Sequence, residues 1–552
     1  MWRNTPQYPP VRFANKGGFC AMDHRQTPAI NETAKAVTAK TKKRPVPTIA
    51  IILLIIAAVL ALSEMLAGFA MPAWQESGEP FALLALLKQG ADGRWEPAAD
   101  ASAAALAAAP TPSPYKTVDG LLLDRVDGGY AVAGHQGDAA EVIIPAQVDG
   151  VPVVGIQDHA FAEFYDLMGI TIPESITSIG EYAFFGCYNL ADISIPAGVA
   201  AIGDAAFAGI ASSARITVAE GNAVFAVEDG ILFDKQQNKL LWVRPDRPAT
   251  GYRIPESTAA VGAYAFYECR NLSDITIPGS VTSIGEGAFA YTAPYARITV
   301  ESDNTVFAVE NAALIDKQQK KLLWCYPMHS DGDYVIPDGI TSIGAYAFAE
   351  CDDMTAVIIP EGVASIGDHA FDNCNRLTRV TIPGSVASIG GAAFIYCPGL
   401  SSVFLPEGVI SIGELAFFGC DKLTDISLPE SVASIGDGAF SYGPADARIT
   451  VAPGNTVFAM EGGALIDRQQ QRLLWYRGGF LKNRYRIPEN VTSVGAYACY
   501  SCEELTRITI HEGVTFIGEH AFAACPKLTL VVPKGSYAEQ YAIADGRTYI
   551  AK

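Results

Sequence analysis

Apolar residues recur along most of the chain in one pattern, I-G-x-x-A-F-x-x-C-x-x-L. Successive copies lie either 23 or 59 residues apart, and an earlier copy has Gln157 where the glycine is expected, so the chain holds twelve copies. Self-similarity at a fixed period is the signature of a repeat architecture. The repeating glycines are Gly180, Gly203, Gly262, Gly285, Gly344, Gly367, Gly390, Gly413, Gly436, Gly495 and Gly518.

The unit that begins at Leu377 reads LTRVTIPGSVASIGGAAFIYCPG. Its first part alternates apolar and polar residues, which predicts a strand with one buried face. Pro383 ends this strand because proline has no N–H for the sheet ladder. We expect Gly390 to allow a tight turn, and Ala393-Phe394 to begin a helical or irregular return that buries the phenylalanine.

One such unit cannot bury its own apolar side, but stacked units can. The sequence therefore predicts an α/β repeat, a leucine-rich-repeat solenoid with a parallel β-sheet on its concave face. Strands spaced ~4.8 Å apart would make the stack roughly 60 Å long or longer.

Three long intervals each contain an A-R-I-T-V strand and two apolar runs separated by a polar D-K-Q-Q or D-R-Q-Q turn. This arrangement predicts a β-hairpin with a buried tryptophan, namely Trp242, Trp324 or Trp475. The hairpins could be a structural elaboration of one coil each, or they could project as recognition elements.

Residues 49–62 read IAIILLIIAAVLAL, and the apolar stretch extends to Trp74 with one interruption at Ser63-Glu64. The basic run KTKKR precedes it, which favours a cytoplasmic N-terminus and places everything after residue 74 outside the membrane. The stretch can be a retained transmembrane signal anchor, or a signal peptide cleaved after about Ala70. The start codon, Met1 or Met22, also stays open.

Charge divides the chain into a basic head and an acidic body. The net charge is −20, but residues 1–48 carry +7 and the remaining residues −27. An acidic body argues against nucleic-acid binding, which needs a basic footprint. Half of the residues are hydrophobic and 18% are charged, so the chain is not predicted to be disordered.

These motifs resemble the BspA-type leucine-rich repeat family from about Tyr115 to Tyr549. The resemblance implies a bacterial surface or secreted protein that binds host matrix proteins or other cells. Members often carry C-terminal wall-anchoring motifs, which the ending YIAK lacks, so we expect attachment through the N-terminal segment. The expected organisation is a basic cytoplasmic segment (1–48), a membrane or signal segment (49–74), an Ala/Pro-rich linker (75–114), an N-terminal cap (115–156), the solenoid (157–530) and a C-terminal cap (531–552).

Eight of the eleven cysteines fall at one repeat position, which predicts a buried ladder of reduced thiols, although an outside location would permit disulfides. Cys499 and Cys502 form a C-x-x-C pair, but Cys499 occupies the phenylalanine position and no second pair completes a zinc site. His159, His369 and His520 share one slot several coils apart, so they are expected to lie on the surface rather than to converge on a metal.

No nucleophile motif, Walker loop or H-E-x-x-H motif is present. We therefore expect no enzyme activity, no catalytic residues, no cofactor and no metal.

The concave sheet is the predicted binding surface, because solenoids bind through such extended faces. Its outward positions are mostly Ser, Thr and Asp, but Ile358 and Phe404 are apolar, with Arg379, Thr381 and Asp425 beside them. An exposed aromatic residue with arginine is typical of an interface anchor. Drift within a repeat array that has no ligand there is the alternative.

The leading hypothesis is a non-catalytic adhesion or protein-recognition module, held at the cell membrane or secreted, whose partner is an extracellular protein or a matrix or cell-surface ligand. A structural envelope protein whose solenoid self-associates is the second hypothesis. An enzyme with an unrecognised site is the third.

Overall fold

The computed structural model describes residues 87–89, 95–97 and 115–552, except 249, 294, 327–332 and 478–482. The expected basic segment and membrane segment lie outside these residues, as does most of the expected linker. Within the described part of the chain, no helix combines the length and the apolar character that a membrane crossing needs.

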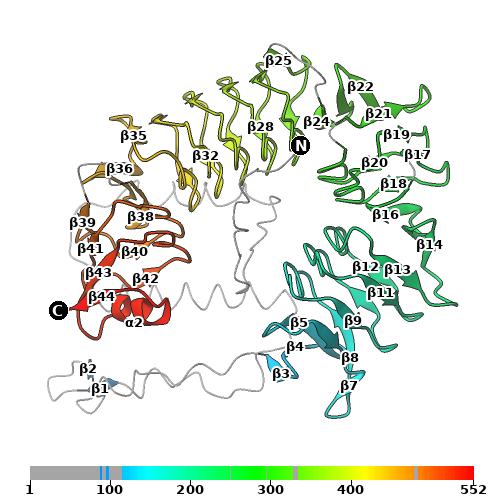
Figure 1. The fold of residues 1–552 in the computed structure, drawn as a ribbon, viewed down its shortest axis with the longest axis horizontal. Helices are drawn as coiled ribbons and strands as arrows, with labels where there is room; N and C mark the ends of the chain where they lie inside the picture. The colour runs from blue at the N-terminus through cyan, green and yellow to red at the C-terminus, as the bar shows by residue number, and fades with distance from the viewer. Residues whose placement is uncertain are drawn as a thin grey trace, which may run out of the picture. The chain divides into compact units, whose positions relative to one another are not determined.

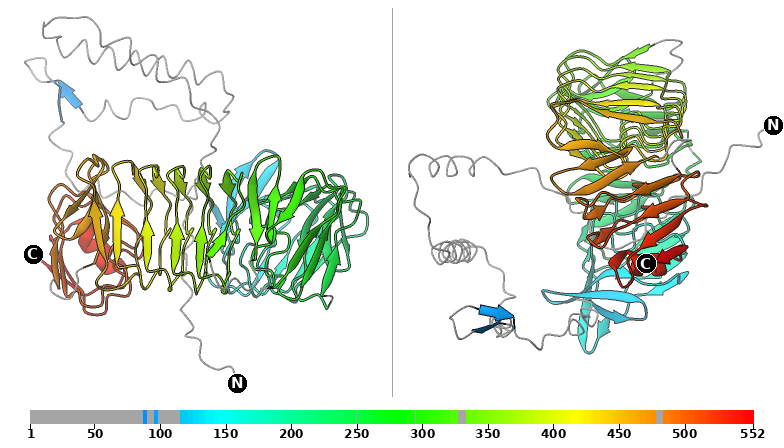
Figure 2. Two further views of the ribbon diagram at one scale, coloured as in Figure 1. Left: turned by 90° about the horizontal axis from the view of Figure 1, so that it is seen from above. Right: turned by 90° about the vertical axis from the view of Figure 1, so that its left-hand side faces the viewer.

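The chain forms two compact units, Met1–Pro114 and Tyr115–Lys552. In the first unit, β1 (Leu87–Gln89) and β2 (Trp95–Pro97) pair antiparallel. The second unit holds the repeats as a stack of coils, which follow one another side by side (Figures 1 and 2).

Each coil contributes one strand to a row of parallel strands that we call the long-strand sheet, which in the described residues consists of five separately hydrogen-bonded sheets. These strands come from the alternating L-x-x-I-x-I segments, with inward residues buried and outward residues mostly exposed. They are β6 (Glu141–Ile143), β9 (Gly169–Thr171), β11 (Asp192–Ile195), β13 (Arg215–Val218), β17 (Gly251–Arg253), β19 (Asp274–Ile277), β21 (Arg297–Val300), β25 (Asp333–Val335), β27 (Ala356–Ile358), β29 (Arg379–Thr381), β31 (Ser402–Phe404), β33 (Asp425–Leu428), β35 (Arg448–Val451), β39 (Arg484–Arg486), β41 (Arg507–Thr509), β43 (Thr529–Val532) and β44 (Tyr549–Ala551).

A second parallel sheet, the short-strand sheet, is made by the residues just before the repeat glycine. Most of its strands are two residues long, and within a block of short units each pairs in register with its equivalent in the next coil. They are β8 (Val151–Ile156), β10 (Ser178–Ile179), β12 (Ala201–Ile202), β18 (Ala260–Val261), β20 (Ser283–Ile284), β26 (Ser342–Ile343), β28 (Ser365–Ile366), β30 (Ser388–Ile389), β32 (Ser411–Ile412), β34 (Ser434–Ile435), β40 (Ser493–Val494) and β42 (Phe516–Ile517).

The repeat glycine is required by close approach between coils. A Cβ atom on Gly413 would lie 2.4 Å from the backbone nitrogen of Gly391 in the preceding coil. The tight-turn role expected for this glycine is therefore not its main one, since no positive φ is found at Gly390 or Gly413.

The return segment of each coil is not helical, so the α/β class predicted from the sequence is wrong for the repeats. Tyr346 and Glu350 adopt positive φ angles of 57° and 55°, which break a helix. Phe348 instead donates its N–H to the carbonyl of Ala370 in the next coil, at 2.7 Å. The solenoid is nearly all strand and turn, and α2 (Tyr537–Ala544) is the α-helix among the described residues.

Both ends of the stack carry additional elements. At the N-terminal end, β3 (Lys116–Val118), β4 (Leu121–Val126) and β5 (Gly129–His135) extend the short-strand sheet, and β7 (Gln147–Val148) pairs with β8. At the C-terminal end, α2 lies between β43 and β44 in the sequence and contacts both strands and β42.

Each long unit holds a three-stranded antiparallel meander, one strand more than the predicted hairpin. Trp242, Trp324 and Trp475 are buried in these meanders, as predicted. The meanders are β14 (Phe225–Glu228), β15 (Ile231–Asp234) and β16 (Lys239–Val243); β22 (Phe307–Glu310), β23 (Ala313–Asp316) and β24 (Lys321–Cys325); and β36 (Phe458–Glu461), β37 (Ala464–Asp467) and β38 (Arg472–Tyr476).

The first and third meanders act as internal partitions of the stack. In the first, Leu232 and Trp242 pack in one hydrophobic core, whereas Ile231 and Val243 pack in the next. The third separates two cores in the same way. Because β15 and β16 are largely buried, the structural interpretation of these segments is favoured over the interpretation as projecting recognition elements.

The long units also explain the curvature of this unit. The extra coil in each long unit contributes strands to the sheets but lacks the A-F-x-x-C return segment, which we also call the turn segment. Aromatic rings of the neighbouring coils therefore meet where that segment is missing, as for Tyr182 and Tyr264, whose ring centroids lie 5.8 Å apart. The turn side is therefore shorter than the long-strand sheet. In Figure 1, β25, β39 and β41 lie outside the curve, and β28, β40 and β42 lie inside it. The prediction that the long-strand sheet is concave is wrong.

A buried asparagine anchors each meander to the preceding coil. The amide nitrogen of Asn304 donates to the carbonyls of Pro278 (2.8 Å) and Val281 (3.0 Å), and its Oδ1 accepts from the N–H groups of Val306 and Phe307. Asn222 and Asn455 make equivalent contacts in the first and third meanders.

We predict that Asn304→Ala lowers the free energy of unfolding by at least about 3 kcal/mol, because it leaves several buried backbone groups without a partner. Thermal or urea unfolding followed by circular dichroism measures the loss. Asn490→Ala, which removes the same atoms from an exposed turn, is the matched control and should change stability by no more than about 0.5 kcal/mol. Equal effects of the two substitutions would contradict the anchoring role.

Candidate functional site

The outward face of the long-strand sheet is built from two adjacent rows of side chains. Strands β25, β27, β29 and β31 pair in parallel and in register, so equivalent residues form continuous rows across the strands. The first row contains Asp333, Ala356, Arg379 and Ser402, and the second contains Val335, Ile358, Thr381 and Phe404.

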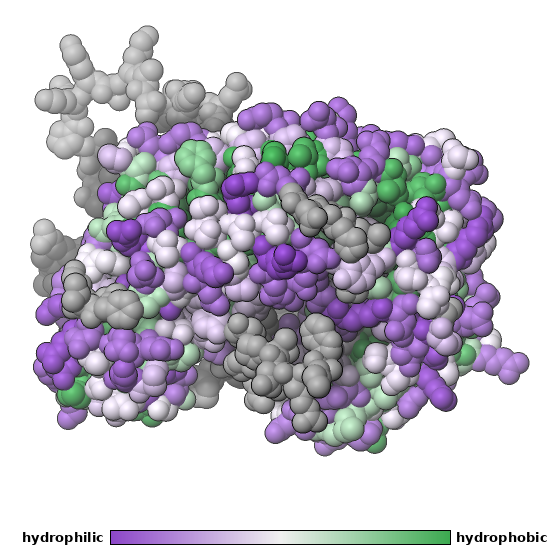
Figure 3. All heavy atoms as spheres, turned by 45° about the horizontal axis from the view of Figure 1, so that its top comes forward, coloured by the Kyte–Doolittle hydropathy of each residue, from purple (hydrophilic) through white to green (hydrophobic). Residues whose placement is uncertain are grey.

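The second row is an apolar strip with one hydroxyl in it. Phe404 is 72% exposed and Val335 is 48% exposed, while Ile358 between them is half-buried. Neighbouring strands are ~4.8 Å apart, so the four side chains extend over roughly 15 Å. We call Val335, Ile358, Thr381 and Phe404 the apolar row. Figure 3, which brings the top of the Figure 1 view forward, shows hydrophobic residues interspersed on a mainly hydrophilic surface.

The first row carries charges that are already paired within the sheet. Arg379 reaches across Ala356 to Asp333, and its Nη2 lies 2.8 Å from both carboxylate oxygens. Asp425 on β33 pairs with Arg448 on β35 at 2.9 Å. These exposed pairs contribute little stability, but they leave a locally balanced charge beside the apolar row.

The structure brings four of the five predicted site residues together and separates the fifth. Ile358, Thr381 and Phe404 lie in one row and Arg379 lies in the adjacent row. Asp425 lies on β33, which pairs with β35 and not with β31. Asp425 therefore belongs to the neighbouring two-stranded sheet of β33 and β35.

Sequence reasoning missed Val335 and Asp333. Their segment, D-Y-V-I-P, follows the same alternation as the other strands and was the signal available. It was hidden because it lies within the second long interval, between Gly285 and Gly344, where the 23-residue register cannot be counted directly.

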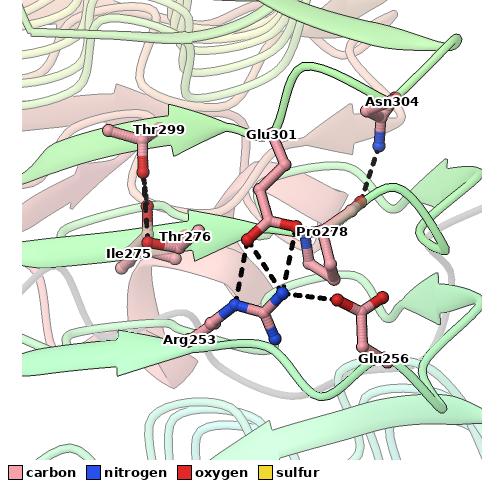
Figure 4. Close-up of polar contacts among 8 residues, drawn as sticks. All are labelled: Arg253, Glu256, Ile275, Thr276, Pro278, Thr299, Glu301 and Asn304. Atoms are coloured by element: carbon pink, nitrogen blue, oxygen red, sulfur yellow. Dashed lines mark hydrogen bonds and ion pairs between the residues drawn. The ribbon is translucent and has the colours of Figure 1, made fainter.

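The equivalent face on β17, β19 and β21, the three long strands before β25, is polar and internally bonded. Arg253, Thr276 and Thr299 occupy the second-row positions on β17, β19 and β21. Arg253 bonds to Glu301 at 2.9 Å and also contacts Glu256, and the hydroxyls of Thr276 and Thr299 lie 3.1 Å apart (Figure 4). The apolar row is thus a local departure from the polar face of the repeat.

The cysteine ladder is part of the core. All ten cysteines in the described part of the chain are buried and free, as expected for reduced residues. Each ladder thiol lies close to a carbonyl oxygen 26 residues earlier, as for Cys187 Sγ and the oxygen of Phe161 at 3.0 Å. Burial raises the pKa of Cys187 to about 12. Cys499, buried at the phenylalanine position, and Cys502 are not a disulfide.

The histidines at the shared slot pack on tyrosines of neighbouring turn segments. His159 stacks on Tyr182 with ring centroids 4.9 Å apart, and His369 stacks on Tyr346 at 4.6 Å. Nδ1 of His369 also lies 2.7 Å from Asp372, which is buried. Among the described residues, no group of three or more His, Cys, Asp or Glu side chains is arranged to hold a metal ion.

Comparison with known proteins identifies the repeats. The family model described as the BspA type leucine rich repeat region matches residues 150–229, 248–316, 329–445 and 481–542, which is more than half of the chain. No curated protein sequence matches the chain.

Several solved structures are similar to this chain. A leucine rich cell surface protein from Faecalibacterium prausnitzii is 26% identical, with 63% of this chain and 96% of that chain covered and a TM-score of 0.36. A leucine-rich repeat protein from Eubacterium ventriosum is 22% identical, with coverage of 74% and 94% and a TM-score of 0.38. One from Bacteroides ovatus is 19% identical, with coverage of 79% and 99% and a TM-score of 0.25.

We predict that the ten described cysteines resist alkylation by iodoacetamide at pH 8 in the folded protein, because burial hinders access of the reagent to the thiols. Mass spectrometry of tryptic peptides measures the modification site by site. The same protein in guanidinium chloride is the control, in which all ten should react. Rapid labelling of the ladder in the folded protein, or disulfide-linked peptides, would contradict a reduced core.

Proposed function

The chain belongs to the BspA-type leucine-rich repeat family, and on this basis we propose that it is a non-catalytic protein-recognition module displayed at a bacterial cell surface. The single observation that carries the proposal is the apolar row of Val335, Ile358, Thr381 and Phe404 on the long-strand sheet. Adhesion to an extracellular protein or to a matrix or cell-surface ligand is the activity we propose for it.

The chemistry of the row supports recognition of a protein surface. Interfaces place aromatic residues and arginine at their centre, surrounded by polar groups that exclude water. Phe404 supplies the exposed aromatic ring, and Arg379 lies in the adjacent row with its guanidinium already oriented by Asp333. Since the strands hold these residues on a rigid sheet, little conformational entropy is lost when a partner binds.

The row lies on the convex side of the unit rather than on the concave side expected from the sequence. A convex face fits a partner that offers a complementary groove or a flat surface. The partner is therefore expected to contact the row of exposed side chains from outside the curve, and to desolvate Phe404 most strongly.

Presentation outside a membrane is proposed from the sequence. The apolar stretch 49–74 follows a basic run, which favours translocation of the segment after it. Either a retained anchor or cleavage after about Ala70 would deliver the repeats to the outside.

We predict that Phe404→Ser weakens partner binding at least about tenfold, because Phe404 is the most exposed member of the row. The partner is first identified by pull-down of matrix and cell-surface proteins with residues 115–552, and affinities are then measured by surface plasmon resonance. Arg379→Ala should give a smaller loss.

The matched control is Phe516→Ser, which removes another exposed phenylalanine, this one from the short-strand sheet. It should leave the affinity unchanged. Unchanged affinity in both Phe404→Ser and Arg379→Ala would remove the apolar row as the recognition surface.

We predict that a protease added to intact cells digests the repeats, because the proposed topology places them outside. Immunoblotting against the repeats measures their loss, with a cytoplasmic protein as the control for lysis. Complete protection of the repeats in cells that express the chain would contradict the proposed placement, while the N-terminal sequence of the mature chain distinguishes anchor from signal peptide.

A further inference from the structure

A groove of about 480 Å³ lies beside the third meander, between β35 and β36. Ile449, Thr450 and Val451 of β35 line one wall, and residues of β36, among them the half-buried Met460, line the other. The two strands follow one another in the chain and lie next to each other in Figure 1. The groove is separate from the apolar row.

One wall of the groove is an unpaired strand edge. In the described part of the chain, β35 pairs only with β33. Arg448 and Ala452 donate their N–H groups to Thr424 and Leu428 on the β33 side. Because alternate residues of a parallel strand face opposite edges, the N–H and C=O groups of Ile449 and Val451 point away from β33.

The opposite wall has an unpaired edge as well. Within the described residues β36 pairs only with β37. The hydrogen bonds use every second residue of this segment, beginning with Val457, whose carbonyl accepts from the N–H of Arg468 at 2.9 Å. Phe458 and Met460 therefore face away from β37. The N–H of Phe458 bonds to Asn455 and its carbonyl accepts from Arg468, so the backbone of Met460 is left to face outward.

Two strand edges that face one groove define the shape of what it can hold. Unpaired edges are templates for another strand, and addition of an extended peptide to a sheet edge is a known mode of recognition. The walls contribute Ile449, Val451 and Met460 as apolar contacts for alternate side chains. A helix would present no free backbone groups to these edges.

The equivalent positions at the second meander differ in character. We call the point where a long strand leads into a meander a junction. The third junction has Ala452-Pro453 where the second has Glu301-Ser302, and Glu301 bonds to Arg253 at the end of the strand (Figure 4). The third junction has only small apolar residues at this point.

We propose that the groove between β35 and β36 is a second binding site, which takes an extended peptide segment of a partner protein as an added β-strand. The peptide pairs in parallel with the free edge of β35 and places alternate apolar side chains against Val451 and Met460. This site shares no residue with the apolar row, so the experiments can contradict one of the two proposed sites and still support the other.

The probe is a fluorescein-labelled synthetic peptide with the sequence LTRVTIP, taken from residues 377–383. In the native sheet this segment contains β29, which pairs in parallel with strands of the same kind as β35. Fluorescence anisotropy with the full-length chain should give saturable binding with a dissociation constant below about 1 mM. Absence of saturation up to that concentration would overturn the proposal.

The decisive variant is Val451→Pro, which removes an outward-facing N–H that takes no part in pairing with β33. Proline is tolerated on an edge strand when its missing N–H faces away from the ladder. The affinity for the peptide should fall at least about tenfold. Val300→Pro, at the same position of β21 beside the second meander, where Glu301 follows the strand, is the matched control and should bind as the unmodified chain does.

Thermal unfolding establishes that both proline variants are folded. Met460→Asp, on the other wall, provides an independent variant if Val451→Pro does not fold, and it should weaken binding to a similar extent. Peptide affinity that is unchanged in folded Val451→Pro or in Met460→Asp would overturn the proposal, as would an equal loss in Val300→Pro.

Discussion

Hydrogen bonding between equivalent residues of successive coils is the interaction on which the rest of this structure depends. Phe348, Phe371 and Phe394 each donate a backbone N–H to the coil that follows, at 2.7 Å, and their rings stack 4.9 to 5.2 Å apart. A single coil has neither partners for these amides nor a place to bury its phenylalanine. Folding therefore requires neighbours, and stability is a property of the stack rather than of any one unit.

The same requirement explains why the long units do not interrupt the stack. Each meander ends in a strand that pairs in parallel with the next coil, as β16 does with β18. Its two faces then pack on the cores before and after it. Loss of one turn segment at each meander shortens one side of the unit, and tyrosines such as Tyr264 and Tyr346 fill the space where the segment is missing. Curvature thus follows from how many coils contribute to each side.

The repeat, the strands and the buried tryptophans could be predicted because each depends on local alternation and on a period that can be counted. The absence of helix in the return segments could not, because A-F-x-x-C has the spacing of an amphipathic turn as well. What decides against the helix is the pair of positive-φ residues in each coil, and those positions hold residues as different as Tyr346 and Glu350. The convex position of the long-strand sheet could not be predicted either, because it depends on missing turn segments rather than on any single residue. Among the site residues, Arg379 and Phe404 could be recognised by their chemistry, whereas Val335 lies inside a 59-residue interval, where the 23-residue register cannot be counted.

The stacking requirement also indicates where recognition can arise. Inside a block of short units the inward side chains are covered and most strand edges are paired, β31 and β33 being the exception, so outward rows such as the apolar row can vary without cost to the fold. At a meander the long-strand sheet is interrupted, since β35 does not pair with β39, and strand edges are left over. An edge of this kind is normally a liability that proteins cover or charge. The second and third meanders share one design but differ in the residue that follows the preceding strand, which is the charged Glu301 in one and the small Ala452 in the other. This difference offers a means of opening a peptide groove beside one meander while the coils on either side stay unchanged.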